Sequence, residues 1–225
     1  EQLYSQCYYR LIHAEADHLP GLIIDRFEDL LVIQPNATWV DQLMDELVEA
    51  LKNVLDPTCI VINGTGRARV LEGLDEGRHV ALGDMPTVAV EVPMNGAVYF
   101  ADIAGGQKTG IFYDQRPNHS FVQKLSAGKK VLDVFSHVGG FGLAAMANGA
   151  AEVTCVDGSQ PALDLAVLGA LATKSDVPFE IFKGDAFNVM MNIASERKIF
   201  DIVICDPPAF APQKASREAG LRAYE

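Results

Sequence analysis

The chain has 225 residues, of which 49% are apolar, so it can bury a core in one large domain or two small ones. No apolar run approaches the roughly 20 residues that span a bilayer, so we expect no membrane segment. Four scattered cysteines without a Cys-x-x-Cys pair are typical of a cytoplasmic protein with reduced thiols. The formal net charge of −12 argues against broad nucleic-acid binding. Binding to a nucleic acid would therefore require a local basic patch.

The first part of the chain, residues 1–104, is predicted to form a small α+β domain. Apolar residues recur at helical spacing through 39–55. Phe27-Glu28-Asp29 separates two apolar runs that predict an antiparallel pair, and Asn95-Gly96 is a strong hairpin signal. Strands are expected at residues 22–25, 30–34, 59–63, 88–92 and 97–101.

From about residue 115 the pattern alternates between strands and helices, which is typical of βαβ units with right-handed crossovers. The expected strands lie at residues 130–135, 152–156, 179–182 and 201–205, and the expected helices at 140–148, 161–172 and 185–195. The predicted fold class is therefore α/β: an incomplete Rossmann-like parallel sheet in residues 105–225, preceded by the α+β domain. The last strand is expected to be a bare edge that exposes apolar surface.

Acidic residues stand at the ends of three successive strands. Asp133 lies in the first strand, Asp157 closes the second and Asp185 follows the third. The carboxyl ends of parallel strands share one edge of a sheet, where ligands bind. Asp133 would repel a pyrophosphate and suits an amine-bearing ligand such as S-adenosylmethionine, while Asp157 can accept both hydroxyls of a ribose. Asp185 can accept from an adenine amino group, with Ala186 or Phe187 lining the ring, and its plainer role is a helix N-cap.

The turn after the first strand is rich in glycine. Gly139-Gly140-Phe141-Gly142 lets the backbone turn sharply and approach a ligand closely. The Gly-x-Gly-x-x-Gly spacing of dinucleotide folds is not present, which disfavours a nicotinamide oxidoreductase. We predict that Phe135, Gly139 and Gly140 contact a cofactor, the alternative being a tight turn packed with glycine. No metal site is expected.

The strand expected at 201–205 stops at Asp206-Pro207-Pro208-Ala209-Phe210, because proline cannot continue a sheet ladder. A carboxylate is thus left at the carboxyl end of a buried strand. Asp-Pro-Pro-x-aromatic after such a strand is associated with methyltransferases that modify a flat, nitrogen-containing base.

These residues together resemble the class I S-adenosylmethionine-dependent methyltransferases. Residues 107–116, Gln-Lys-Thr-Gly-Ile-Phe-Tyr-Asp-Gln-Arg, resemble the Lys-Thr-Gly-x-x-x-Asp-Gln-Arg segment of the ribosomal RNA large-subunit cytosine-C5 methyltransferase family. Residues 19–27 resemble the central domain of that family, so the resemblance covers nearly the whole chain. It implies S-adenosylmethionine as cofactor and methylation of an RNA base, with cytosine C5 of large-subunit ribosomal RNA as the leading target.

The resemblance also implies roles for particular residues. Lys108 or Arg116 would pair with the carboxylate of the cofactor, the alternative for Arg116 being an anchor for an interdomain linker. Asp206 and Pro207 would face the target base, and Phe210 would stack on it.

Methylation of carbon 5 of cytosine requires a cysteine thiolate that adds to carbon 6. Cys205 neighbours Asp206, so the alternation of side chains along a strand predicts that Cys205 faces a covering helix, and Cys155 is also expected to be buried. In the resembled family the nucleophile lies in a later Ser-Cys-Ser-like segment, expected beyond Glu225. The chain begins without methionine and ends within an expected helix, so we expect a fragment that lacks an N-terminal PUA domain and the C-terminal part of the catalytic domain.

Other functions stay open. They are amino-group methylation of guanine or adenine in RNA, a non-catalytic module that binds S-adenosylmethionine or RNA, and, least favoured, a nicotinamide oxidoreductase. The expected partner is RNA, homodimerisation is left open, no membrane is involved, and the expected location is the cytoplasm. The activity of this piece by itself is also left open.

Overall fold

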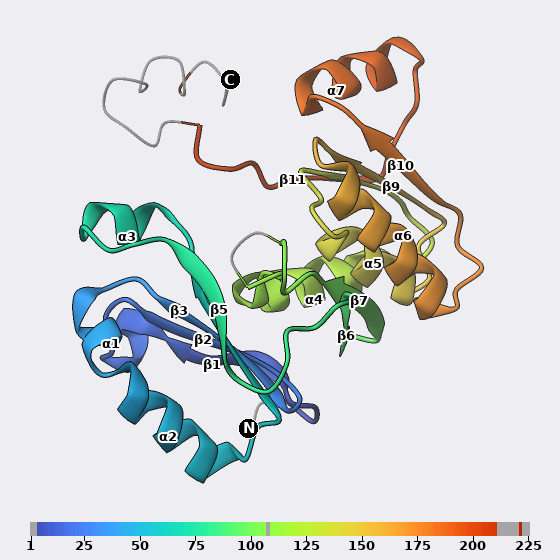
Figure 1. Ribbon diagram of the computed structural model, residues 1–225. Coiled ribbons are helices and arrows are strands. Elements are labelled where there is room, and N and C mark those ends of the chain that lie inside the picture. The colour runs from blue at the N-terminus through green and yellow to red at the C-terminus, as the bar shows by residue number, and fades with distance from the viewer. Residues whose placement is uncertain (1–3, 107–108, 211–220, 222–225) are drawn as a thin grey trace. The chain divides into compact units, whose positions relative to one another are not determined.

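The computed structural model describes residues 4–106, 109–210 and 221. The chain divides into two compact units, Glu1–Pro117 and Asn118–Glu225, which Figure 1 draws in ribbon form. This division falls later than the sequence-based boundary at residue 104, so that residues 105–117 group with the first unit. None of the helices in the described ranges is long and apolar enough to cross a membrane.

The first unit is built on a five-stranded sheet in the order β1-β2-β3-β4-β5. Strands β3 and β4 run parallel, and the other neighbours are antiparallel. The strands are β1 (Tyr8–His13), β2 (Leu22–Phe27), β3 (Leu30–Pro35), β4 (Cys59–Gly64) and β5 (Gly77–Leu82). The helices are α1 (Thr38–Gln42), α2 (Met44–Leu55) and α3 (Arg67–Leu71), with the short 3₁₀ turns η1 (Ala14–Asp17) and η2 (Tyr113–Gln115).

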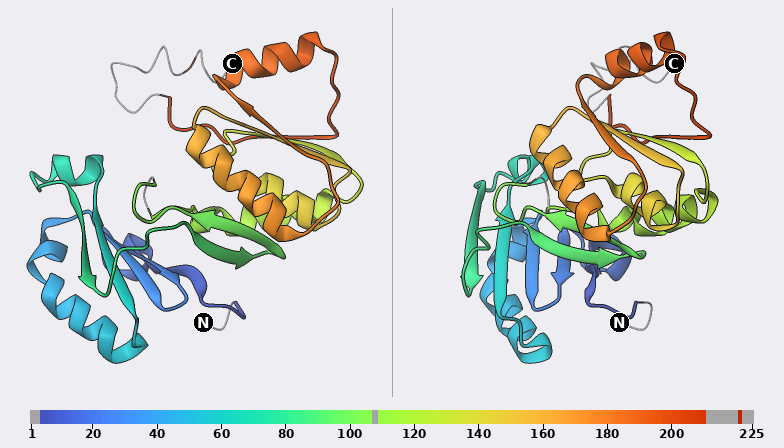
Figure 2. Two further views of the ribbon diagram at one scale, coloured as in Figure 1. Left: turned by 45° about the vertical axis from the view of Figure 1, so that its right-hand side comes forward. Right: turned by 90° about the vertical axis from the view of Figure 1, so that its right-hand side faces the viewer.

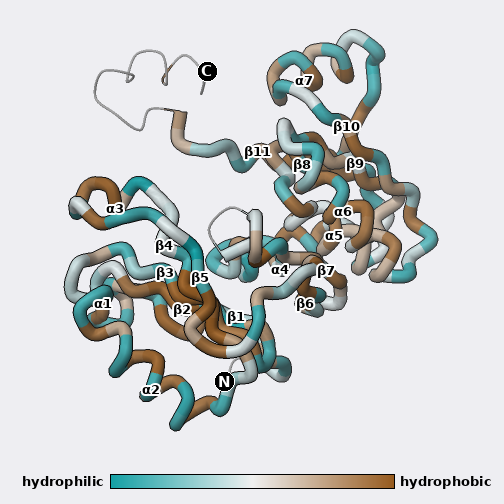
Figure 3. The backbone as a smooth tube through the Cα atoms, viewed as in Figure 1, coloured by the Kyte–Doolittle hydropathy of each residue, from teal (hydrophilic) through white to brown (hydrophobic). Residues whose placement is uncertain are grey.

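Apolar side chains on one face of this sheet form a core with α1 and α2. Leu22, Ile24 and Leu31 are almost completely buried there, and the hydrophobic stretches of the strands are visible in Figure 3. Side chains alternate along a strand, so Asp25 and Phe27 point to the opposite face. Residues 109–117 cover that face and contact both of them.

The elements expected in this unit are confirmed with one correction, whereas β1, β5 and α3 were not predicted from the sequence. The antiparallel pair of β2 and β3 forms, and the residue between the strands, Glu28, has φ 58°. The hairpin of β6 (Val90–Met94) and β7 (Ala97–Ala101) turns at Asn95-Gly96, where both φ angles are positive as a type I′ turn requires. The helix expected at 39–55 is instead two helices, because the backbone leaves helical geometry at Leu43, where φ is −110°.

The second unit is a four-stranded parallel sheet in the order β10-β9-β8-β11, as the βαβ pattern predicts. Its strands are β8 (Lys130–Val134), β9 (Glu152–Asp157), β10 (Phe179–Lys183) and β11 (Ile202–Cys205). Its helices are α5 (Gly140–Ala147), α6 (Gln160–Thr173) and α7 (Ala186–Ser195), and α4 (Arg116–Leu125) begins at the junction of the units. Figure 2 shows α5 and α6 on one face of the sheet and α7 on the other. Leu132, Val134 and Val156 pack against α7.

Strand β11 lies at an edge of this sheet and pairs only with β8 among the described strands. Val203 is 57% exposed, which confirms the expected bare apolar edge. The expectation that Cys205 is buried is wrong, because Cys205 is exposed. Val203 and Cys205 lie on the same face of the sheet as Leu132 and Val134 of β8, which α7 covers. Among the described residues, α7 does not cover this face of β11 as well.

Candidate cofactor and base site

The carboxyl ends of all four strands of the second unit meet at one edge of its sheet, because the strands are parallel. In sheet order this edge carries Asp185, Asp157, Asp133 and Asp206. The register pairs Asp133 with Cys155 and Asp157 with Lys183. The row of carboxylates that the sequence predicts therefore exists as a structural feature.

Asp133 is the most unusual member of this row, because it is only 1% exposed. Its Oδ2 atom accepts the N–H of Gly142 at 2.8 Å, whereas its Oδ1 atom is buried and accepts no hydrogen bond from the described residues. Burial raises the pKa of Asp133 to about 7, and the charges of Asp206 and Asp157 add to the rise, while the N–H groups of Gly142 and Phe141 oppose it. A buried acceptor without a donor is the place for a cationic or N–H-bearing ligand group.

Asp157 closes β9 and is half-buried. Its two oxygens each accept one backbone N–H at 2.8 Å, from His137 and from Ser159. A carboxylate oxygen has two lone-pair positions, so each still has room for a hydroxyl donor. Asp157 thus holds the turn after β8 and the start of α6 together, and it keeps the acceptor capacity that a ribose diol needs.

Asp185 is the N-cap of α7, since its Oδ1 accepts the N–H of Asn188 at 3.0 Å. The plainer of the two sequence-based roles is therefore present. The side chain is exposed, and its second oxygen accepts no hydrogen bond from the described residues, so the adenine role stays a prediction. Ala186 is 5% exposed and packs into the core beneath the sheet, which leaves its backbone, and not its methyl group, for a ligand.

The turn between β8 and α5 is shaped by close packing. Gly139 has φ 80°, a conformation that favours glycine, and it is the N-cap of α5. Gly142 allows α5 to approach the sheet, because a Cβ atom there would lie 2.6 Å from Sγ of Cys155. Gly140 faces the ring of His119, which a Cβ would approach to 2.7 Å. Packing thus accounts for these glycines, and cofactor contact by Gly139 and Gly140 stays a prediction.

Three phenylalanines from three different loops or elements gather near this edge. The ring centroids of Phe135 and Phe187 are 6.4 Å apart, those of Phe135 and Phe210 are 6.0 Å apart, and those of Phe187 and Phe210 are 5.7 Å apart. Phe135 is half-buried and has φ 64°, so the backbone turns sharply as it leaves β8. The structure thus brings together the aromatic residues that the sequence assigned separately to cofactor and base.

The residues after β11 are open to solvent on the described surface. Asp206 is exposed, Pro207 is half-buried, and the N–H of Asp206 extends the pairing with β8 by a 3.4 Å bond to the carbonyl of Val134. Partial burial and the charge of Asp206 raise the pKa of Cys205, which is the opposite of what activates a thiol. Cys155 is buried as expected, and burial raises its pKa well above the ordinary value. Neither thiol has the environment of a nucleophile.

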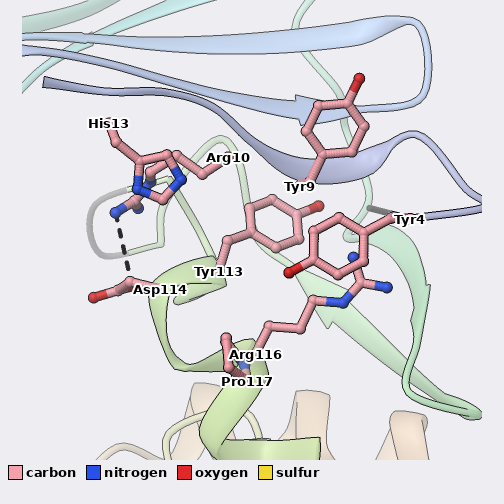
Figure 4. A pocket seen from close by; sticks show the side chains of 8 residues that line it. All are labelled: Tyr4, Tyr9, Arg10, His13, Tyr113, Asp114, Arg116 and Pro117. Atoms are coloured by element: carbon pink, nitrogen blue, oxygen red, sulfur yellow. Dashed lines mark ion pairs between the residues drawn. The ribbon is translucent and has the colours of Figure 1, made fainter. Parts of the chain in front are cut away.

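The two basic residues predicted to hold the cofactor carboxylate have different outcomes. Lys108 lies outside the described residues. Arg116 is 7% exposed, and its Nη1 donates to the carbonyl of Tyr8 at 2.7 Å within the first unit. Its guanidinium also lies against the Tyr4 ring (Figure 4), and the distance from Cζ to the ring centroid is 3.7 Å. These contacts are those of an anchor, and pairing with a cofactor stays a prediction.

Sequence reasoning missed the surroundings of Arg116. They form a pocket that includes Tyr4, Arg10 and His13, and two of these lie in β1, which was not predicted. The run Tyr8–His13 alternates polar and apolar side chains too weakly to stand out, although Tyr-Tyr-Arg is a composition that β-strands favour.

A comparison with protein-family models matches residues 10–218 to the S-adenosylmethionine-dependent methyltransferases. The chain belongs to this family. The family match decides against a nicotinamide oxidoreductase, and S-adenosylmethionine is the family's cofactor.

Curated relatives agree with this family. "Ribosomal RNA large subunit methyltransferase I" of Photobacterium profundum is 41% identical over 219 residues, which are 96% of this chain and 55% of the relative. The protein of the same name from Vibrio cholerae is 38% identical over 221 residues, with the same coverage of 96% and 55%. The chain therefore spans about half the length of the curated relatives it matches.

Solved structures show the same fold. A structure described as that of a methyltransferase complexed with SAH has a TM-score of 0.80 at 27% identity, and the match covers 93% of this chain and 53% of that one. A methyltransferase from Streptococcus mutans also gives a TM-score of 0.80, at 25% identity over 98% of this chain and 59% of the other. The α/β, Rossmann-like fold class predicted from the sequence is thereby confirmed.

The residues at the sheet edge fit the family's cofactor. Asp133 offers an unsatisfied buried oxygen for an ammonium group, and Asp157 offers acceptor positions for a ribose. The exposed Asp185 and the ring of Phe187 stand beside them for a purine.

Proposed function

We propose that this chain belongs to an RNA methyltransferase that uses S-adenosylmethionine to methylate cytosine C5 of large-subunit ribosomal RNA in the cytoplasm. The names of the relatives support the RNA class, and the unpaired, buried Oδ1 of Asp133 is the observation in this chain that carries cofactor binding. When bound, the cofactor supplies a methyl group that is already activated on a sulfonium centre, so the protein mainly aligns donor and acceptor.

Each residue of the edge has a proposed task. Asp133 holds the amino group of the cofactor's methionine, Asp157 accepts the ribose hydroxyls, and Asp185 accepts from the adenine amino group. Phe135 and the backbone at Gly139 and Gly140 line the bound molecule. Lys108 or Arg116 is assigned to the cofactor carboxylate on the resemblance of residues 107–116 alone.

The target base is assigned to the residues after β11. Asp206 and Pro207 are proposed to face the base, and Phe210 to stack on it. The exposed position of Asp206 and the grouping of Phe210 with two other rings support this assignment. The environments of Cys155 and Cys205 do not activate a thiol. The nucleophile for carbon methylation is assigned, on the resemblance alone, to a later Ser-Cys-Ser-like segment.

The decisive experiment is methyl transfer by the full-length polypeptide onto unmodified large-subunit ribosomal RNA, followed by mass spectrometry of the nucleosides. We expect 5-methylcytidine. Detection of an N-methylated guanosine or adenosine would instead indicate amino-group methylation. Cofactor binding without incorporation of a methyl group into RNA would support a non-catalytic module. The Asp206→Asn variant should lose transfer while retaining cofactor affinity.

Asp157 offers a separate test of the cofactor site. We expect Asp157→Ala to weaken S-adenosylmethionine binding by about tenfold or more, since a charge-assisted hydrogen bond contributes about 1.5–3 kcal/mol. Isothermal calorimetry measures the affinity. Because Asp157 also holds the N–H groups of His137 and Ser159, the Asp157→Asn variant, which can keep one of those bonds, serves as the control for local disruption. Unchanged affinity in the alanine variant would remove the ribose role.

A further inference from the structure

A small pocket in the first unit is lined by aromatic and cationic side chains. Its volume is about 90 Å³, and its walls come from the N-terminal residues, β1, η2 and the start of α4 (Figure 4). Tyr4, Tyr9 and Tyr113 supply the rings, and Arg10 and Arg116 supply the guanidinium groups. On a chain with a net charge of −12, two arginines at one hollow are an exception to the general composition.

Arg116 carries a buried positive charge that no carboxylate of the described residues neutralises. Its Nη1 bonds to the carbonyl of Tyr8 at 2.7 Å, and its Nε lies 3.5 Å from Oδ1 of Asn95. The third neighbour is the face of the Tyr4 ring. All three partners are neutral, and burial lowers the pKa of Arg116. Buried arginines are normally paired with an acid, because an isolated buried charge is costly. This arrangement calls for an anion.

Arg10 differs, because its charge is already matched. Its Nε and Nη2 bond to the buried Asp25 at 2.8 and 3.2 Å. Its Nη1 points toward Asp114, whose Oδ1 is 3.8 Å away and therefore beyond hydrogen-bond distance (Figure 4). The Asp114 side chain is 49% exposed and is the one acidic side chain among the described residues that line the pocket. Asp114 therefore acts against an incoming anion, and Arg10 supplies an N–H donor for it.

Size and stacking narrow the class of ligand. The pocket is small, with a volume of about 90 Å³, and its guanidinium groups suit a compact anion such as a phosphate group. The rings of Tyr4 and Tyr9 are stacked, with centroids 6.3 Å apart and planes 23° from parallel. The Arg116 guanidinium covers one face of the half-buried Tyr4 ring, so a neighbouring base would stack on the part of the ring that stays open to solvent, as in proteins that bind single strands.

We propose that this pocket binds a backbone phosphate of single-stranded RNA through the Arg116 charge, with an adjacent base stacked on Tyr4. The choice of RNA over other phosphates rests on the proposed function. The site gives an otherwise acidic chain a local point of attachment for a polyanion, where the overall charge would repel it.

The test is the affinity of the full-length polypeptide for a short, fluorescently labelled single-stranded RNA, measured by anisotropy at fixed salt. Asp114→Asn should tighten binding about threefold to fivefold, because removing one nearby like charge in a partly solvated site is worth roughly 1 kcal/mol. Asp45→Asn removes the same charge from exposed α2 in the same unit and should shift the affinity less than about twofold. Tyr4→Ala should weaken binding about tenfold, since one stacked base contributes about 1–3 kcal/mol.

Equal effects of Asp114→Asn and Asp45→Asn, together with an unaltered affinity in Tyr4→Ala, would overturn the proposal. So would tighter binding of inorganic phosphate than of RNA, because the pocket would then hold a free anion. Arg116→Gln, checked for folding by circular dichroism, should weaken RNA binding. If it instead weakens only S-adenosylmethionine binding, its charge serves the cofactor carboxylate and the proposal fails.

Methyl transfer is measured in parallel to separate the two proposals. A wild-type protein that transfers no methyl group to RNA, but shows the expected shifts in RNA affinity, supports the phosphate site and contradicts the proposed function. If the Tyr4→Ala and Asp114→Asn variants methylate RNA as well as the wild type does and bind RNA with unaltered affinity, the result contradicts the phosphate site alone.

Discussion

At the scale of single residues, Asp133 combines two properties that are usually separate. It is an acid buried in the sheet, and it retains an oxygen without a donor. Burial makes its charged form costly in the folded chain, whereas a bound ammonium group would make the same charge favourable. Stability and ligand binding therefore place opposite demands on this residue.

Replacement of Asp133 should separate these demands. The folded chain binds the Asp133 proton more tightly than the unfolded chain, because the pKa is raised from 3.8 to about 7. This contribution therefore lowers stability as the pH rises from about 4 to about 7, by at most about 4 kcal/mol for a shift of about three units. Asp133→Asn should raise the free energy of unfolding at pH 8 and leave it nearly unchanged at pH 4, as urea titrations would show.

The same variant should bind S-adenosylmethionine at least about tenfold more weakly, since it loses a charge-assisted contact. For the wild type, calorimetry should show affinity falling as the pH drops below about 7 and Asp133 takes up its proton. Equal stability of the two proteins at both pH values would contradict the raised pKa.

At the scale of elements, the helices of the second unit start where short side chains and glycines permit it. Asp185 caps α7, and Gly142 lets α5 lie close to β9. Asp185 thus has a structural role as well as a predicted functional one, and Gly142 has a structural role. Variants that keep one role and remove the other can tell them apart.

Asp185 allows such a separation. Asp185→Ser retains a good N-cap, so the free energy of unfolding should change by less than about 0.5 kcal/mol, whereas Asp185→Ala should cost about 1 kcal/mol. If Asp185 also accepts from the adenine, both variants should weaken S-adenosylmethionine binding in calorimetry. Retained affinity in the serine variant would leave Asp185 as a cap alone.

Gly142 tests the packing of α5 on the sheet. A Cβ atom 2.6 Å from Sγ of Cys155 overpacks the core, so Gly142→Ala should cost about 1–3 kcal/mol in denaturant unfolding. Cys155→Ala provides room, and the double variant should be more stable than the sum of the single effects predicts. Gly77→Ala, where a Cβ meets nothing within 4 Å, is the control. If the stability changes of Gly142→Ala and Cys155→Ala simply add in the double variant, the alanine at position 142 does not clash with Cys155.

At the scale of the whole molecule, the two units differ in how their sheets are covered. In the first unit helices cover one face, and residues 109–117 contact the other through Thr109 and Tyr113. In the second unit the β11 edge exposes apolar surface within the described residues. An exposed apolar edge strand favours association with other chains.

The edge predicts a change in self-association. Val203→Lys places a charge on the exposed face of β11 and should reduce concentration-dependent association of this chain, as measured by light scattering. The free energy of unfolding should change little, because Val203 is 57% exposed. The matched control is Val54→Lys on helix α2, a side chain that is 79% exposed. Equal association of both variants and the parent would show that β11 does not mediate contacts.

Local patterns in the sequence suffice to predict the alternating elements of the second unit, the hairpin at Asn95-Gly96 and the row of carboxylates at the sheet edge. Those features follow from local periodicity and from proline and glycine, and a parallel sheet brings its strand ends together once its strands are known. Three features could be learned from the folded chain alone: Cys205 is exposed, Asp133 keeps an unpaired oxygen, and Arg116 lies buried beside Tyr4. The burial and the hydrogen-bond pairing of a side chain depend on which distant segments pack against its face of the sheet. The alternation of side chains along one strand does not indicate which segments those are.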